Sequence, residues 1–265
     1  MTMDGVGRTV GWTMLFLVLV FLALPILIVI PISFSSSSVL AFPPQGFSLR
    51  WYYNVRNADS ILSALGLSAQ IAFLSTCISL LIGTLCAIAI VRGYIPGGRA
   101  IATLMVSPLM VPGLVLGIAF LQAARDFGLR DAYLTLLFAH VVVTLPFIMR
   151  TVLASLSLFD FTMIDAARML GLSYPKALWK VLVPNILPGF MSGALFAFVA
   201  SFDNYPVSIF LVDVRTKTLP IQLLNQLEMS PDPTLAAVST MLIVLTVCAL
   251  FVCDRLVGLR RMAAI

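Results

Sequence analysis

The sequence predicts an all-α membrane protein with six transmembrane helices. The first observation is composition: 61% of the 265 residues are hydrophobic, 10% are charged, and the mean hydropathy is +1.09, whereas soluble domains carry roughly 25% charged residues. The second is that the apolar residues form six long runs that are free of charge except for one aspartate. Runs of about 20 apolar residues cross a bilayer, and they do so as helices because backbone polar groups must pair within the segment. This composition excludes a soluble enzyme and a disordered chain.

The six predicted spans fill most of the chain. They cover residues 10 to about 34, 61–91, 100–124, 132–149, 181 to about 212, and 233–253. The first is too long for the apolar region of a signal peptide, which has about 7–15 residues, so it is expected to be a retained helix. In the third, Pro108 and Pro112 free backbone carbonyls, and irregular backbone is expected there, either buried in protein or lining a water-filled path.

Charge placement predicts the orientation of the chain. Six spans put both termini on one side, and that side holds ten of the 16 Lys and Arg residues, against six on the other. Cytoplasmic loops retain Lys and Arg, so both termini and the loop at residues 150–180 are expected to be cytoplasmic. The net charge of +5 is explained by this topology and does not indicate nucleic-acid binding.

Other features of the spans and their connections indicate packing rather than chemistry. Two glycine pairs have the four-residue spacing that lets helix backbones approach closely, Gly113 with Gly117 and Gly189 with Gly193. The only histidine, His140, is expected to be packed and hydrogen-bonded. The four cysteines lie in apolar runs without C-x-x-C spacing, so neither a disulfide framework nor a metal site is predicted. After the turn at residues 42–46, the aromatic run at 51–53 suits a short helix at the outer membrane surface, or else an ordinary loop.

The loop at residues 150–180 is long for a compact bundle. Its residues 162–170 are compatible with a helix that ends at Gly171, a residue type favoured just after a helix. A second helical start follows Pro175 and runs into the fifth span. Small side chains at Ala166 and Ala167 leave room for another surface to sit close. The loop therefore suits a docking element, the alternative being a structured loop without a partner.

A motif of 20 residues crosses this loop. It consists of Asp165-Ala166-Ala167, Gly171 after three residues, and Val181-Leu182-Val183-Pro184 after nine more. It resembles the E-A-A-x3-G-x9-I-x-L-P signature of the permease subunits of binding-protein-dependent ABC importers. Asp165, Val181 and Val183 depart from the signature but keep its charge, shape and spacing. The resemblance covers roughly residues 61–254 and adds the segment at 47–52, which looks like the family's outer-face segment.

The resemblance implies a type I ABC importer permease fold in a bacterial inner membrane. Residues 1–60 would form the first helix and a periplasmic interfacial segment, 61–254 the five-helix core with a coupling loop at about 159–184, and 255–265 a short cytoplasmic tail. A coupling helix would dock on a cytoplasmic ATPase dimer through Asp165, Ala166, Ala167, Gly171 and Pro184. A second permease, expected to be a paralogue, and a periplasmic substrate-binding protein would complete the importer in the lipid bilayer. The chain lacks a G-x4-G-K-[ST] phosphate loop, so the partner would use the ATP and Mg, and this chain would bind no cofactor and catalyse no reaction.

The segment Ser201-Phe202-Asp203-Asn204-Tyr205-Pro206 is similar to the spermidine/putrescine branch of the family, where S-F-D-[DNE] recurs. A carboxylate inside a membrane span is by default a functional-site hypothesis. Asp203 could attract an ammonium group, with the Tyr205 ring face and the Asn204 amide beside it. Alternatively, an arginine of a neighbouring subunit or backbone donors satisfy Asp203. The predicted solute is a polyamine or similar organic cation, and the alternatives are an amino-acid derivative, an opine, a phosphonate or a metal.

Two other function classes fit the sequence less well. An intramembrane enzyme would need a nucleophile and a base within reach, and the chain has one histidine with neither G-x-S-x-G nor H-E-x-x-H. A stand-alone channel or secondary transporter would leave the coupling-type loop unexplained, and secondary transporters usually show internal repeats. An importer permease is therefore the favoured function.

Overall fold

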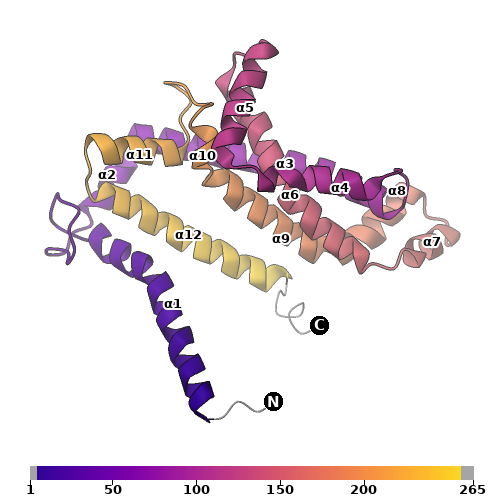
Figure 1. The fold of residues 1–265 in the computed structure, drawn as a ribbon, viewed down its shortest axis with the longest axis horizontal. Helices are drawn as coiled ribbons and strands as arrows, with labels where there is room; N and C mark the ends of the chain where they lie inside the picture. The colour runs from indigo at the N-terminus through magenta and orange to yellow at the C-terminus, as the bar shows by residue number, and fades with distance from the viewer. Residues whose placement is uncertain (1–4, 258–265) are drawn as a thin grey trace. The chain divides into compact units, whose positions relative to one another are not determined.

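The computed structural model describes residues 5–257, and every regular element in that range is helical (Figure 1). In chain order the elements are α1 (Gly5–Ser33), α2 (Arg50–Asn57), α3 (Asp59–Val91), α4 (Gly98–Val106), η1 (Ser107–Met110), α5 (Gly113–Asp126), α6 (Ala132–Ser157), α7 (Thr162–Met169), α8 (Tyr174–Ala177), η2 (Leu178–Leu182), α9 (Val183–Phe202), α10 (Tyr205–Ser208), α11 (Leu219–Met229) and α12 (Thr234–Val257). The chain forms two compact units, which are described separately. Within the described range, one holds residues 5–62 together with 223–248, and the other holds 63–222 together with 249–257.

The predicted all-α membrane fold is confirmed. Five helical segments of the described chain are long and apolar enough to cross a bilayer: Gly7–Ser33, Asp59–Val91, Ala132–Ser157, Tyr174–Phe202 and Thr234–Val252. A bent pair, Gly98–Met110 with Gly113–Asp126, makes a sixth span when its two arms are counted together.

The third span differs from the continuous helix predicted at residues 100–124. The segment is bent by 107° at the break between its two arms, around Val111. Val111 is extended, with φ −89° and ψ 130°, and Pro112 after it has φ −54° and ψ 133°. A proline disfavours the helical conformation of the residue before it, so Val111 cannot continue the helix. The irregular backbone expected from Pro108 and Pro112 is present, and it bends the segment sharply.

The fifth span also differs from its prediction, because it stops at Phe202 instead of continuing to about residue 212. Asp203 has φ −98° and ψ 17°, and a new short helix, α10, begins at Tyr205. The Asn204 side chain accepts a hydrogen bond from the Val207 amide at 3.1 Å, the contact by which asparagine caps a helix start. Pro206 has no N–H to donate to the Phe202 carbonyl, which favours a break in the helix at this point. Asp203 therefore lies at a helix break and not inside a helix.

Helices α6 and α9 pack closely in the second unit and lie side by side in Figure 1. Gly189 and Gly193 of α9 face Ser155 and Thr151 of α6, whose side chains occupy the space that a Cβ atom would need. The other glycine pair packs against α10: a Cβ atom on Gly113 would lie 2.8 Å from the Pro206 Cβ, and one on Gly117 would lie 2.9 Å from the Val207 carbonyl oxygen. The packing role predicted for both pairs is confirmed.

In the first unit, the predicted short helix after the proline turn is α2. Trp51 and Val55 are buried, and the Trp51 indole N–H donates to the Ser35 carbonyl at 2.7 Å. The hydroxyls of Ser33 and Tyr52 lie 2.7 Å apart. These contacts hold α2 against the end of α1. Most apolar side chains of α1 before Pro25 are exposed within this chain.

Candidate functional site

The coupling-type loop contains the helix that its sequence predicts, and Gly171 ends it. Helix α7 runs from Thr162 to Met169, and Gly171 has φ +90°. The Gly171 amide donates to the Arg168 carbonyl at 2.9 Å, and the Leu172 amide donates to the Ala167 carbonyl at 3.2 Å. This is the Schellman arrangement, which pairs the last carbonyls of a helix through a residue in the left-handed conformation. At the other end, the Asp160 carboxylate accepts from the Thr162 amide at 2.9 Å, and this hydrogen bond lowers the Asp160 pKa.

Helix α7 buries one face and exposes the other. Ile164 and Ala167 are buried in the core of the second unit, whereas Asp165 and Ala166 are exposed. Ala167 therefore packs inward and does not lie on the open face where its small side chain was expected. Two apolar side chains that the sequence did not single out lie at the loop tip, Met169 at 89% exposure and Leu170 at 83%. Two neighbouring apolar side chains at the tip of this loop are available to a partner surface.

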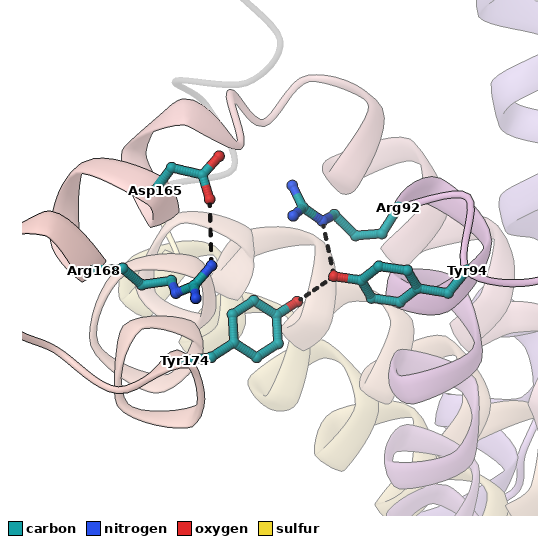
Figure 2. A network of polar contacts seen from close by, with 5 residues as sticks. All are labelled: Arg92, Tyr94, Asp165, Arg168 and Tyr174. Atoms are coloured by element: carbon teal, nitrogen blue, oxygen red, sulfur yellow. Dashed lines mark hydrogen bonds and ion pairs between the residues drawn. The ribbon is translucent and has the colours of Figure 1, made fainter.

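Aromatic and basic side chains tie the loop to the end of α3 (Figure 2). The Arg92 Nε–H donates to the Tyr94 hydroxyl at 3.4 Å, and that hydroxyl lies 3.4 Å from the Tyr174 hydroxyl. The Arg168 guanidinium lies 5.7 Å from the centre of the Tyr174 ring. Hydrogen bonds from Tyr174 and then Arg92 lower the pKa of Tyr94. The network joins segments about 80 residues apart, so no local pattern could have predicted it.

An ion pair in Figure 2 lies within α7 itself. Asp165 and Arg168 are 4.0 Å apart, and both side chains are about half exposed. Exposed pairs of this kind contribute little stability, roughly 0–1 kcal/mol. The charge of Asp165 is therefore available to a surface that approaches α7.

Pro184 lies at the start of α9, where the chain has just completed a π-helical turn. In η2 the Val183 amide donates to the Leu178 carbonyl, five residues back. Pro184 is exposed and has no N–H for the next helical bond. A π-helical turn is one of the adjustments by which helices accommodate such an interruption. Asp165, Ala166, Gly171 and Pro184 thus have exposed positions, but Pro184 belongs to the span and not to α7.

The predicted substrate-path residues lie together at the break between α9 and α10. Asp203 is exposed within this chain, and among residues 5–257 its carboxylate has no hydrogen bond or ion pair. Asn204 is different: its amide oxygen accepts from Val207 and its amide nitrogen donates to the Ala200 carbonyl at 3.3 Å. The Asn204 amide, expected to offer hydrogen bonds to a solute, is used by the backbone. Tyr205 is partly exposed.

A cavity of about 210 Å³ lies beside this break. It is mainly apolar, and Asn204 is its most polar lining residue; the others include Pro108 and Gly113 of the bent span, Val143 and Phe147 of α6, and Val207 of α10. The bent third span and the interrupted fifth span thus border one hollow. Irregular backbone at membrane depth is expected in such a place.

His140 of α6 packs against both sides of the break and is 1% exposed. Its Nδ1 lies 2.7 Å from the Ser201 hydroxyl and its Nε2 lies 3.1 Å from the Ser208 hydroxyl. The prediction that His140 is a packed, hydrogen-bonded residue is confirmed. Its two partners lie 61 and 68 residues away along the chain, so the sequence alone could not have named them.

Comparison with known proteins identifies the family. Residues 79–260 match the family described as the binding-protein-dependent transport system inner membrane component. The chain belongs to this family. It is a multi-pass component of a transport system in the inner membrane and is not an enzyme, which sets aside the intramembrane-enzyme alternative.

Individual relatives support the same assignment. The chain is 32% identical to the spermidine/putrescine transport system permease protein PotC of Haemophilus influenzae, over 92% of this chain and 94% of that protein. It is 29% identical to the putrescine transport system permease protein PotI of Escherichia coli strain K12, over 88% and 85% of the two chains. A crystal structure of a bacterial ABC transporter involved in the import of alginate shares the fold with a TM-score of 0.70, at 18% identity, over 96% of this chain and 99% of that one. The resemblance to ABC importer permeases is confirmed.

Proposed function

We propose that this chain forms half of the translocation path of an ATP-driven importer for a polyamine or a similar organic cation. The observation that carries the proposal is the Asp203 carboxylate, which is exposed and unpaired in the described part of the chain, at a break in a membrane helix. The printed names of the relatives PotC and PotI, which refer to spermidine and putrescine, support the same solute class.

An ammonium group is the natural partner for Asp203. Leaving an ionised carboxylate unpaired at membrane depth is costly, so such residues pair with other charges or face a water-filled path. A polyamine would supply the positive charge as it passes, and hydrogen bonds to charged groups contribute roughly 1.5–3 kcal/mol. Tyr205 follows two residues later and would present its ring face to the same cation.

The same chain could serve an importer of the same class for another solute. An amino-acid derivative or opine also carries an ammonium group that Asp203 would attract, whereas a phosphonate would be repelled by it. A metal cation would need more ligands than one carboxylate, and residues 5–257 contain no cluster of three or more His, Cys, Asp or Glu side chains suited to one. The unpaired carboxylate therefore favours an organic cation.

The proposed partners follow from the exposed elements. A cytoplasmic ATPase dimer, which would use ATP and Mg, would receive α7 through Asp165, Ala166 and the apolar tip at Met169 and Leu170. A second permease would complete the path, and a periplasmic substrate-binding protein would deliver the solute to the opposite face. In this arrangement both termini lie in the cytoplasm, as the excess of Lys and Arg on their side indicates.

The test is uptake of radiolabelled spermidine by the assembled importer in proteoliposomes, comparing Asp203→Asn with Asp203→Glu. We expect Asp203→Asn to raise the KM for spermidine about 10- to 100-fold, because the neutral amide loses a charge-assisted hydrogen bond. Asp203→Glu keeps the charge and should retain most of the uptake.

Asp126→Asn is the matched control. Asp126 is exposed at the end of α5, so this substitution removes the same charge at a position away from the break. It should leave the KM unchanged. Equal KM values in Asp203→Asn and the wild type would contradict the proposed contact, and absence of spermidine uptake by the wild-type complex would contradict the proposed solute.

A further inference from the structure

A fully buried side chain from another helix, His140 of α6, bridges the helix break at Asp203. Ser201 is in the last turn of α9 and Ser208 is the last residue of α10. His140 reaches both, with Nδ1 at 2.7 Å from the Ser201 hydroxyl and Nε2 at 3.1 Å from the Ser208 hydroxyl. All three side chains are nearly inaccessible to solvent, at 0–2% exposure. One imidazole on α6 therefore contacts the chain on both sides of Asp203.

The direction of these hydrogen bonds follows from the remaining contacts. The Ser208 hydroxyl donates its hydrogen to the Asn204 carbonyl oxygen, so it must accept from His140, and Nε2 carries a hydrogen. A neutral imidazole then has Nδ1 free to accept the hydrogen of Ser201. On its other side Ser201 lies 3.1 Å from the Ser75 hydroxyl of α3. The result is a chain of polar groups from α3 through α9 and α6 to the Asn204 carbonyl, next to Asp203.

We propose that His140 is a positioning residue that fixes the shape of the segment 203–205, and thereby the placement of the Asp203 carboxylate for its solute. This inference rests on the proposed function for the role of Asp203, but the bridge itself does not depend on the identity of the solute. The backbone amides of 203–205 make only local hydrogen bonds, from Asp203 to the Val199 carbonyl, from Asn204 to the Ser201 carbonyl and from Tyr205 to the Asp203 carbonyl. Contacts from a neighbouring helix therefore add to the pre-organisation of the segment, and pre-organisation raises affinity by removing an ordering cost from the binding step. His140 contacts both sides of the segment from α6, in addition to the Asn204 amide, which links Ala200 to Val207 from within the break.

The KM for spermidine distinguishes a positioning role of His140 from a role in core stability alone. His140→Leu keeps a side chain of comparable bulk and removes both ring nitrogens, whereas His140→Gln keeps one donor and one acceptor. For spermidine uptake by the assembled importer, we expect His140→Leu to raise KM about tenfold with the maximal rate retained. His140→Gln should remain within about threefold of the wild type.

Ser79→Ala is the matched control. Ser79 lies on α3, is fully buried, and bonds the Thr144 hydroxyl at 2.7 Å and the Val141 carbonyl at 3.1 Å without reaching the break. It loses a buried hydrogen bond of the same kind, so its KM should match the wild type. An unchanged KM in His140→Leu, or an equal rise in Ser79→Ala, would overturn the positioning role.

A second readout does not require transport. In a variant without the natural cysteines, Tyr205→Cys is labelled with a small maleimide in the assembled complex without solute. We expect His140→Leu to change the labelling rate at least fivefold and His140→Gln to leave it nearly unchanged. If the wild-type complex takes up no spermidine, the proposed solute fails while this experiment still decides the role of His140. Equal labelling rates in the wild type and His140→Leu would refute it.

Discussion

Replacing Gly171 with valine tests whether α7 is the coupling helix, because the substitution disfavours the backbone conformation of its C-terminal cap without creating a steric clash. The residue has φ +90°, and a Cβ atom built on it would meet nothing within 4 Å. The substitution therefore creates no clash, and its cost comes from placing an L residue in the left-handed region, about 1–2 kcal/mol and more for a β-branched side chain. A cost of about 1–2 kcal/mol shifts the local equilibrium away from the capped geometry about 5- to 30-fold.

The consequence should be confined to α7, because this helix depends on its cap. It has eight residues, and helices this short are marginal without tertiary support and satisfied termini. We expect Gly171→Val to assemble in the membrane and to leave basal ATP hydrolysis by the complex in place. The ratio of solute imported to ATP hydrolysed should fall at least tenfold. The assay measures both quantities on the same proteoliposomes.

Gly128 offers a control with the same geometry at a different place. It follows α5 with φ +70°, its amide donates to the Arg125 carbonyl at 3.0 Å, and the Leu129 amide donates to the Ala124 carbonyl at 2.7 Å. Gly128→Val therefore breaks the same type of cap at a similar backbone cost, with nothing within 4 Å of its Cβ position. Should Gly171→Val keep the wild-type ratio, or should both variants lower it equally, α7 would not be the coupling element.

Two further substitutions test packing and docking. Gly193→Leu should destabilise the α6–α9 pair by about 1–3 kcal/mol, because its side chain would occupy the place of the Thr151 hydroxyl; thermal unfolding in detergent measures this, and Gly66→Leu, with open space around its Cβ position, should cost far less. Leu170→Asp should reduce recovery of the ATPase with the tagged permease severalfold while leaving thermal stability unchanged, since the Leu170 side chain is 83% exposed. Undiminished recovery would exclude Leu170 from the docking surface.

Residue types at neighbouring positions predict where helices end or break, but they do not predict the angles at which the chain continues. The cap at Gly171 and the irregular backbone at Pro108 and Pro112 follow from residue types at neighbouring positions, and both are present. The 107° bend is not predictable in this way, because one proline can kink a helix, end it or turn it back, and the packing of distant helices decides which. The end of the fifth span at Phe202 was within reach of the sequence, since Asn204 followed by Pro206 is a signal for a helix start.

The contacts within the candidate sites are harder to predict from the sequence, because residue type alone does not show which side chains of a helix face the protein core. Ala166 and Ala167 are identical in type, and only the packing of α7 decides that Ala167 faces the core. The contacts of His140 and of Tyr94 join segments more than 60 residues apart. Sequence could identify the loop and the break as candidates, but only the folded chain shows which side chains hold them in shape.

The two candidate regions lie at opposite ends of one helical segment. Tyr174–Phe202 runs 29 residues from the network beside α7 to the break at Asp203, a length of about 43 Å at 1.5 Å per residue. Along the way Gly189 and Gly193 bring α9 into close contact with α6, the helix that also carries His140. A force applied at the loop would therefore move α6 and α9 together, with the His140 bridge intact. If the proposed roles of Asp203 and His140 hold, the Asp203 segment would change its position during transport while keeping its shape. Different residues would then set the affinity of the site and its access to either side of the membrane.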